Sequence, residues 1–131
     1  MSSEQMLYDR VGGMEFFERL VDAFYDEVVN DEVLLPLYPA PHDLSGARHR
    51  LTLFLAQYWG GPTIYNEERG HPRLRIRHFP FLIGSQERDH WLICMAVAVQ
   101  ASTDDREIQA ELMDYFVNAA EHLQNDDIPR G

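Results

Sequence analysis

The sequence predicts an all-α protein of one domain. Apolar residues recur at three- and four-residue steps in several segments, as they do along the buried face of a helix. No segment shows the strict alternation of apolar and polar residues that marks a half-buried strand. The length of 131 residues fits a single domain, which we expect to occupy residues 1–131 with loose termini at 1–5 and 126–131.

The beginning of the chain predicts a short helix followed by a long one. Gly12 and Gly13 are expected to end the short helix, because glycine tolerates the left-handed backbone at a helix C-terminus. Residues 14–30 form the long helix, and its apolar stripe comprises Phe17, Leu20, Val21, Phe24 and Val28. Residues 31–35 add one further turn, which Pro36 stops.

The next helix is expected to end at Tyr58, with Asp43 or Ser45 as its N-cap. Its apolar face comprises Leu51, Phe54, Leu55 and Tyr58. A Gly-Gly-Pro triplet ends it, and residues 60–70 are predicted to form a long loop. Pro72 suits the first position of a short helix that follows this loop.

Two more helices complete the predicted fold. Ser85 is the expected N-cap of a helix that reaches about Val99, and Thr103 or Asp104 is the expected N-cap of the last one. The inward positions of the first are Trp91, Cys94, Met95 and Ala98. Those of the second are Ile108, Leu112, Tyr115 or Phe116, Ala119 and Leu123.

The charge of the protein is strongly acidic but unevenly distributed. The formal net charge is −11, and all 11 basic residues are arginines. Residues 44–86 hold six of these arginines and only two acids, a charge of +4, so the remainder carries −15. The overall charge argues against nucleic-acid binding, which needs clustered cations. The cationic middle instead predicts a site for a specific anion.

The sequence suggests a soluble protein of the cytoplasm without a membrane partner. Its first residues have neither the basic nor the apolar region of a signal peptide. The longest apolar run, residues 91–99, is far shorter than the ~20 residues that span a bilayer. Cys94 is the only cysteine, so there is no disulfide framework.

Two Glu-x-x-His pairs raise the alternative of a di-iron carboxylate helical bundle, since this spacing puts both side chains on one helical face. Glu68 and His71 make a poor pair, because a glycine lies between them and a proline follows. Glu87 and His90 fit an exposed polar face better than a metal site. The di-iron bundle is therefore a remote alternative, and a helical interaction module without a cofactor is another.

His78 lies among arginines and aromatic residues, in the run RGHPRLRIRHFPF. A haem site needs one imidazole for the iron, an apolar crevice for the porphyrin and cations for its two propionates. Taken from the residues alone, a packed core or loop histidine is the commoner explanation.

Two strings of the sequence resemble the group II (O type) truncated haemoglobins of bacteria. They are LAQYWGGPTIYNEERGHPRLRIRH, residues 55–78, and ERDHWL, residues 87–92. Shorter agreements precede them at residues 11–13, 24–25 and 37–39. The resemblance extends from about Met6 to Leu123 and implies a globin-like two-over-two helical sandwich around haem b, iron protoporphyrin IX.

The resemblance implies a role for each of several residues. By position, His78 matches the proximal iron ligand, whose second ring nitrogen is expected to donate to a backbone carbonyl. The distal side is expected to hold hydrogen-bond donors from Tyr25, Tyr38 and Trp91, although each of these alone would suggest ordinary packing. The expected open gate is Ala47, and the apolar contacts of the pocket are Leu51, Phe54, Leu55 and Phe81.

The arginines and the other histidines fit this interpretation in different ways. Arg50 and Arg77 are the leading candidates for the propionates, with Arg75 third. Arg48, Arg69 and Arg73 are expected to be solvated. His71 is expected to fix the loop in place. His42, His49, His90 and His122 are expected at the surface, although His90 directly precedes Trp91 and suggests a pH-sensitive distal side.

The function implied is the binding of dioxygen and other small diatomic ligands, for oxygen binding, sensing or redox chemistry. The alternative is a haem enzyme of the peroxidase or nitric-oxide-detoxifying type, which would need an external electron-donating reductase. The sequence assigns no catalytic residue, and it leaves the oligomeric state open, with a homo-oligomer among the options.

Overall fold

A computed structural model describes residues 6–78 and 83–125, and the expected loose termini lie outside these ranges. The helices are α1 (Leu7–Arg10), α2 (Met14–Val28), α3 (Ser45–Tyr58), α4 (Ile64–Arg69), α5 (Leu74–His78), α6 (Ser85–Ser102) and α7 (Arg106–Leu123), with a short 3₁₀ turn, η1 (Leu35–Leu37). The described residues contain no strand, which confirms the all-α prediction. No helix among them is long and apolar enough to cross a membrane.

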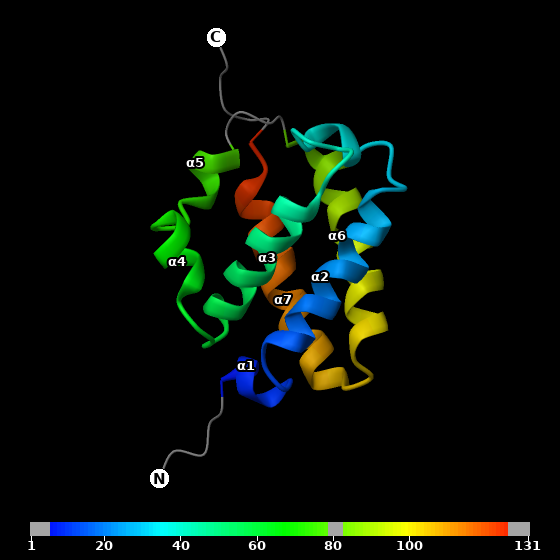
Figure 1. The fold of residues 1–131 in the computed structure, drawn as a ribbon. Coiled ribbons are helices and arrows are strands. Elements are labelled where there is room, and N and C mark those ends of the chain that lie inside the picture. The colour runs from blue at the N-terminus through cyan, green and yellow to red at the C-terminus, as the bar shows by residue number, and fades with distance from the viewer. Residues whose placement is uncertain (1–5, 79–82, 126–131) are drawn as a thin grey trace.

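The four long helices form two packed pairs, as Figure 1 shows. Helix α2 packs against α3 and α6, and α6 also packs against α7. The short helices α4 and α5 lie on the outer side of α3. This arrangement is the two-over-two sandwich expected from the sequence, and it leaves the space between α3, α5 and α7 for the site described below.

The predicted apolar stripe of α2 forms the centre of the core. Phe17, Leu20, Val21, Phe24 and Val28 are completely buried. Burying one such side chain stabilises the fold by about 1.5–3 kcal/mol. The inward positions of α6 and α7 meet this stripe, with Met95, Leu112 and Phe116 at 1% exposure or less. Tyr58 is an exception to its predicted face, since half of its surface is exposed at the end of α3.

Several predicted N-caps are displaced by one residue. Leu44 caps α3, and Asp43 accepts a hydrogen bond from the Ser45 amide instead. Gly84 caps α6, and its amide donates to Glu87 Oε1 at 2.8 Å. The cap of α7 is Asp105, whose carboxylate accepts from the amides of Glu107 and Ile108. Leu44 and Gly84 are less favoured N-cap residues than the neighbours that the sequence suggested, and helix ends are in any case predicted only to within one or two residues.

The prediction of a loop over residues 60–70 was wrong, because α4 occupies its second half. Tyr65 anchors this helix by inserting into the fold, and the amide of Asn66 donates to Gln57 Oε1 on α3 at 3.0 Å. The short helix after Pro72 begins only at Leu74, since Arg73 adopts a positive φ of 44° that is incompatible with a helix.

Gly61 lies where the backbone that follows α3 comes close to α1. Its amide donates to the carbonyl of Ala56 at 2.7 Å, and the amide of Tyr8 donates to the carbonyl of Trp59 at 3.0 Å. A Cβ added at Gly61 would lie 2.6 Å from the Tyr8 ring and 2.8 Å from the Ala56 carbonyl oxygen. No side chain fits at this position without displacing backbone.

Gly61→Ala is therefore expected to lower the free energy of unfolding by about 1–3 kcal/mol, the usual effect of overpacking. The matched control is Gly46→Ala in α3, where the added Cβ meets only the mobile end of Arg50 at 3.0 Å. There the helix propensity of alanine should leave stability unchanged or raise it by up to about 1 kcal/mol. Urea denaturation measures both, and equal stabilities of the two variants would contradict the close approach.

Candidate functional site

A cavity of about 540 Å³ lies between the helix pairs. Its lining comes from α3, α5, α6 and α7, from Tyr25 of α2 and from the segment after α2. Of the residues singled out in the sequence, those that line it are Tyr25, Tyr38, Ala47, Arg50, Leu51, Phe54, Leu55, Arg77, His78 and Trp91. Residues that are distant in the sequence are thus brought to one site.

A second hollow of about 560 Å³ lies outside this cavity, between the end of α3 and α7. It is more open to solvent, and its rim carries the acidic residues Glu111 and Asp114. Glu111 is already paired with Arg10 at 2.8 Å. The enclosed cavity, which collects the histidine, the tyrosines and the arginines, is therefore the better candidate site.

His78 enters the cavity from the last position of α5. Its Nδ1 lies 2.7 Å from the carbonyl oxygen of Leu74, one helical turn earlier. A carbonyl oxygen only accepts hydrogen bonds, so Nδ1 carries the proton and the neutral ring keeps its lone pair on Nε2. This is the bond that the sequence resemblance implies for an iron-ligating histidine, whose second nitrogen fixes the tautomer.

Arg77 fastens the backbone that leads to His78. Its Nε donates to the carbonyl of Pro72 at 2.6 Å, and its Nη2 donates to the carbonyl of Arg69 at 2.9 Å. His71 supports the same turn, since its Nδ1 accepts from the Arg73 amide at 3.2 Å. Arg77 therefore fixes the proximal turn in addition to lining the cavity.

Tyr25 and Tyr38 contact each other where they line the cavity. Their rings make an edge contact with centroids 5.6 Å apart, and their hydroxyl groups share a hydrogen bond. Burial raises the pKa of Tyr25, and the hydrogen bond with Tyr38 only partly offsets this. Burial and the neighbouring phenol raise the pKa of Tyr38 well above its usual value. Both phenols therefore keep their protons and remain donors at neutral pH.

Trp91 closes the wall between these tyrosines and α7. Its ring packs against Phe24 and Phe116, with centroids 5.2 and 5.6 Å away. These contacts hold the indole at the cavity surface while the core lies behind it. The three residues expected on the distal side thus border one cavity.

Arg48 is not the solvated side chain that the sequence suggested. Its guanidinium lies 5.7 Å from the centroid of the Tyr25 ring and is paired with Asp22 and Asp26 at 3.0 and 3.2 Å. Arg69 and Arg73 are exposed as expected, although Arg69 also reaches the cavity rim. Arg50 is exposed and lines the cavity, as a residue of its rim.

The structure also corrects the surface assignment of His90. His42, His49 and His122 are exposed, but His90 is half-buried and its Nδ1 lies 2.9 Å from Asp31 Oδ2. No pattern in the sequence singled out Asp31, which is 59 residues away from its partner. Leu34, Leu37 and Tyr65 also line the cavity without having been predicted to do so.

The Glu-x-x-His pairs do not come together as metal sites. Glu68 Oε1 instead meets His49 at 3.0 Å, and Glu87 accepts from the Gly84 amide. Within the described residues, no three His, Cys, Asp or Glu side chains are grouped so that they could hold a metal ion. Phe81 and the side chain of Arg75 lie outside the described part, so their predicted contacts stay predictions.

Comparisons with known proteins show that the chain is a globin. The bacterial-like globin family matches residues 6–125. The chain is 40% identical over 113 residues to the group 2 truncated hemoglobin YjbI of Bacillus subtilis, across 86% of this chain and 84% of that protein. The solved structure of a thermostable hemoglobin from Thermobifida fusca is similar with a TM-score of 0.90 and 48% identity, across 96% of this chain and all of that one. The truncated oxygen-avid haemoglobin of Bacillus subtilis has a TM-score of 0.86 and 38% identity, across 92% of this chain and all of that one.

The reactivity of Cys94 tests the burial and negative charge that surround its thiol in α6. Burial and the carboxylates of Asp31 and Glu27 raise the pKa of its thiol to about 11. Because the thiolate is the reactive form, about one molecule in a thousand is reactive at pH 8. Labelling by a disulfide reagent should be slow, and its rate should still rise between pH 9 and 10.5, where an ordinary thiol has levelled off. A rate that levels near pH 9 in the native protein would contradict the assigned environment, and the unfolded chain serves as the control.

Proposed function

Because the chain belongs to the group II truncated haemoglobins within the bacterial-like globins, we propose that its cavity holds haem b with His78 as the proximal iron ligand. We further propose that Tyr25, Tyr38 and Trp91 retain dioxygen or another diatomic ligand on the opposite side. The hydrogen bond from His78 Nδ1 to the Leu74 carbonyl carries this proposal, because it leaves Nε2 as the basic nitrogen.

The residues of the cavity fit haem in size and chemistry. A volume of about 540 Å³ is within the range of small-molecule and cofactor sites. Leu51, Phe54 and Leu55 supply apolar surface from α3, while Arg50 at the rim supplies a cation. When bound, haem supplies an iron with one open position for a small ligand.

Contacts within the chain already orient the proposed iron ligand. The 2.7 Å bond to Leu74 orients the His78 ring, and the two carbonyl contacts of Arg77 fix the turn from which α5 starts. A rigid imidazole needs little reordering when it coordinates a metal, which favours binding. Arg50 and Arg77 are the proposed propionate partners, with Arg75 as the third.

The distal residues provide donors where a diatomic ligand would lie. The Tyr25 and Tyr38 hydroxyls share one hydrogen bond, so one of the two phenol protons is available for another acceptor. The indole N–H of Trp91 is a further donor, and the small side chain of Ala47 in α3 is the proposed open gate. Each net hydrogen bond in a dry pocket stabilises a ligand by about 1 kcal/mol, so several together slow its release strongly.

Strong retention favours oxygen binding or sensing over rapid delivery. The Bacillus subtilis relative is described as oxygen-avid, which agrees with a donor-rich distal side. The same donors would polarise a bound peroxide, so a haem enzyme of the peroxidase or nitric-oxide-detoxifying type is the second candidate. That function needs electrons from an external reductase. We place the protein, with either function, in the cytoplasm.

His78→Ala is expected to remove the intense Soret absorption band of the haem-loaded protein, or to shift it to that of weakly held haem. The control is His42→Ala, which removes an exposed imidazole and should leave the band unchanged. Added imidazole should restore much of the wild-type spectrum to His78→Ala, because it occupies the vacated position. A colourless wild-type protein that takes up no added haemin would contradict the whole proposal.

Tyr38→Phe and Trp91→Phe each remove one donor and are expected to speed oxygen release about five- to tenfold, since about 1.4 kcal/mol corresponds to a factor of ten. Stopped-flow displacement of oxygen by carbon monoxide measures these rates. Tyr58→Phe is the matched control, because Tyr58 is exposed and does not line the cavity. If both distal variants release oxygen at the wild-type rate, the donors are not what holds the ligand.

A further inference from the structure

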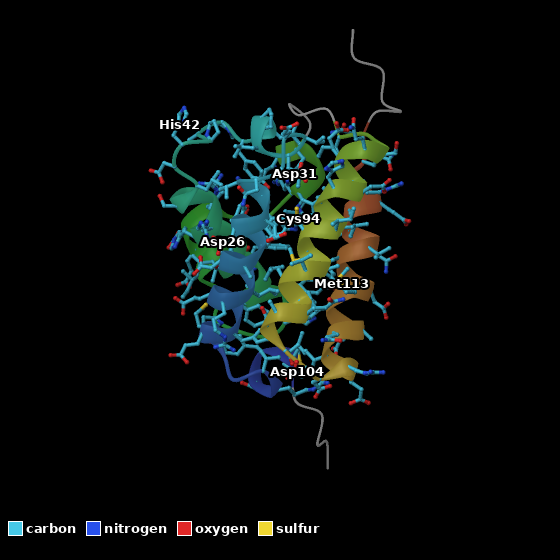
Figure 2. All side chains as sticks on the ribbon, turned by 90° about the vertical axis from the view of Figure 1, so that its right-hand side faces the viewer. Asp26, Asp31, His42, Cys94, Asp104 and Met113 are labelled. Carbon is cyan, nitrogen blue, oxygen red and sulfur yellow. The ribbon has the colours of Figure 1, made fainter. Side chains whose placement is uncertain are left out.

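The carboxylate of Asp31 is shared between two parts of the molecule. Its Oδ1 accepts hydrogen bonds from the amides of Val33 and Leu34, both at 2.9 Å. His90 Nδ1 lies 2.9 Å from its Oδ2 and 3.1 Å from its Oδ1. The Sγ of Cys94 lies 3.9 Å from the same Oδ2. Figure 2 shows Asp31 and Cys94 on the side of the molecule where the end of α2 meets α6.

The backbone amides held by Asp31 begin the segment that ends in Tyr38. The Leu35 amide donates to the Asp31 carbonyl at 3.0 Å, and the Tyr38 amide donates to the Leu35 carbonyl at 3.2 Å. Leu34, which lies between them, is almost completely buried and lines the cavity. A continuous series of hydrogen bonds therefore connects the Asp31 carboxylate to the backbone of Tyr38.

The other partner of the carboxylate, His90, belongs to α6 and directly precedes Trp91. The Asp31–His90 contact therefore joins the segment that carries one distal donor to the helix that carries another. The Asp31 side chain is 15% exposed and that of His90 is 37% exposed. The contact is thus more shielded from solvent than an ordinary surface pair, whose interaction is small.

We propose that the Asp31–His90 contact is a positioning device, which sets the separation of the Tyr38 hydroxyl and the Trp91 indole and thereby the rate of ligand escape. We further propose that the contact is strongest when His90 is protonated, so that escape slows as the pH falls from 8 to 5.5. This inference rests on the function proposed above.

The charges around the contact support this direction of the pH effect. Burial acts to raise the pKa of Asp31, but the hydrogen bonds from His90 and from two backbone amides outweigh it and lower the pKa. The carboxylate therefore stays charged throughout the range in which histidine side chains change charge, pH 5–8. Protonation of His90 then adds a positive charge beside a constant negative one.

The other titratable groups near the contact are accounted for. Glu27 of α2 and the Cys94 thiol lie on the same side, and the thiol is neutral in this range because its pKa is about 11. Within α6, Glu87 accepts from the Gly84 amide. The guanidinium of Arg88 is directed to Asp89 at 3.1 Å and to Gln124 at 2.8 Å, and neither contact involves Asp31.

Three variants of the haem-loaded protein test the inference. Asp31→Asn removes the negative charge and keeps the size of the side chain. His90→Asn keeps a hydrogen-bond donor but cannot take up a proton. Asp89→Asn is the matched control, since this exposed carboxylate neighbours His90 but pairs with Arg88. Oxygen release is measured at pH 5.5 and 8, together with the infrared stretch of bound carbon monoxide, which reports on the distal donors.

The wild type and Asp89→Asn should release oxygen about two- to fivefold more slowly at pH 5.5 than at pH 8. Asp31→Asn should release it about three- to tenfold faster than the wild type at pH 5.5, lose the pH dependence and broaden or split the carbon monoxide band. His90→Asn should keep the wild-type rate of pH 8 at both pH values. Amide exchange at Leu34 should become faster in Asp31→Asn, which a role confined to the haem would not cause.

The inference would be overturned by a persistent pH dependence in His90→Asn, or by an unchanged rate and band in Asp31→Asn. Its failure differs from that of the proposed function, because an intact Soret band in every variant would show that the protein still binds haem. Absence of that band in the wild type would instead contradict the function itself and this inference with it.

Discussion

A single hydrogen bond, from His78 Nδ1 to the carbonyl of Leu74, determines which ring nitrogen remains basic in the cavity. This bond joins the first and last residues of α5, and Arg77 holds the turn before this helix by its contacts to Pro72 and Arg69. The two-over-two packing of the long helices then brings the tyrosines of the α2 side and Trp91 of α6 to the same cavity. The fold thus lines one mostly apolar space with a histidine of fixed tautomer and a group of neutral donors.

The proximal and distal sides are held by different physical means. Backbone carbonyls fix His78, the proposed iron ligand, and a carbonyl group does not titrate. The distal donors depend on side-chain contacts between elements, namely the Arg48 guanidinium above the Tyr25 ring and the Asp31–His90 contact beside Trp91. Variation in the distal contacts can therefore alter ligand retention while the iron ligand stays the same. This separation is why we expect the Asp31–His90 contact to act on ligand escape and not on the hydrogen bond between His78 and Leu74.

The sequence predicted the long helices well, because a continuous apolar stripe such as Phe17 to Val28 has one interpretation. It missed α4, since six residues with one buried anchor, Tyr65, give no periodicity. The candidate residues of the site came from a family resemblance, and the structure brings most of them to one cavity. The Asp31–His90 contact was beyond prediction, because its partners are 59 residues apart and each alone fits an exposed position. Tertiary contacts of polar side chains leave no periodic signal in a sequence.

Resonance Raman spectroscopy of the ferrous, ligand-free protein tests the central claim most directly, because it detects the bond between the iron and a histidine nitrogen. The iron–histidine stretching band should shift when histidine is labelled with nitrogen-15, and it should be absent from His78→Ala. It should return at a new frequency when imidazole is added to that variant. An iron–histidine band that survives in His78→Ala would show that another histidine holds the iron, and a wild type without any such band would show that no histidine does.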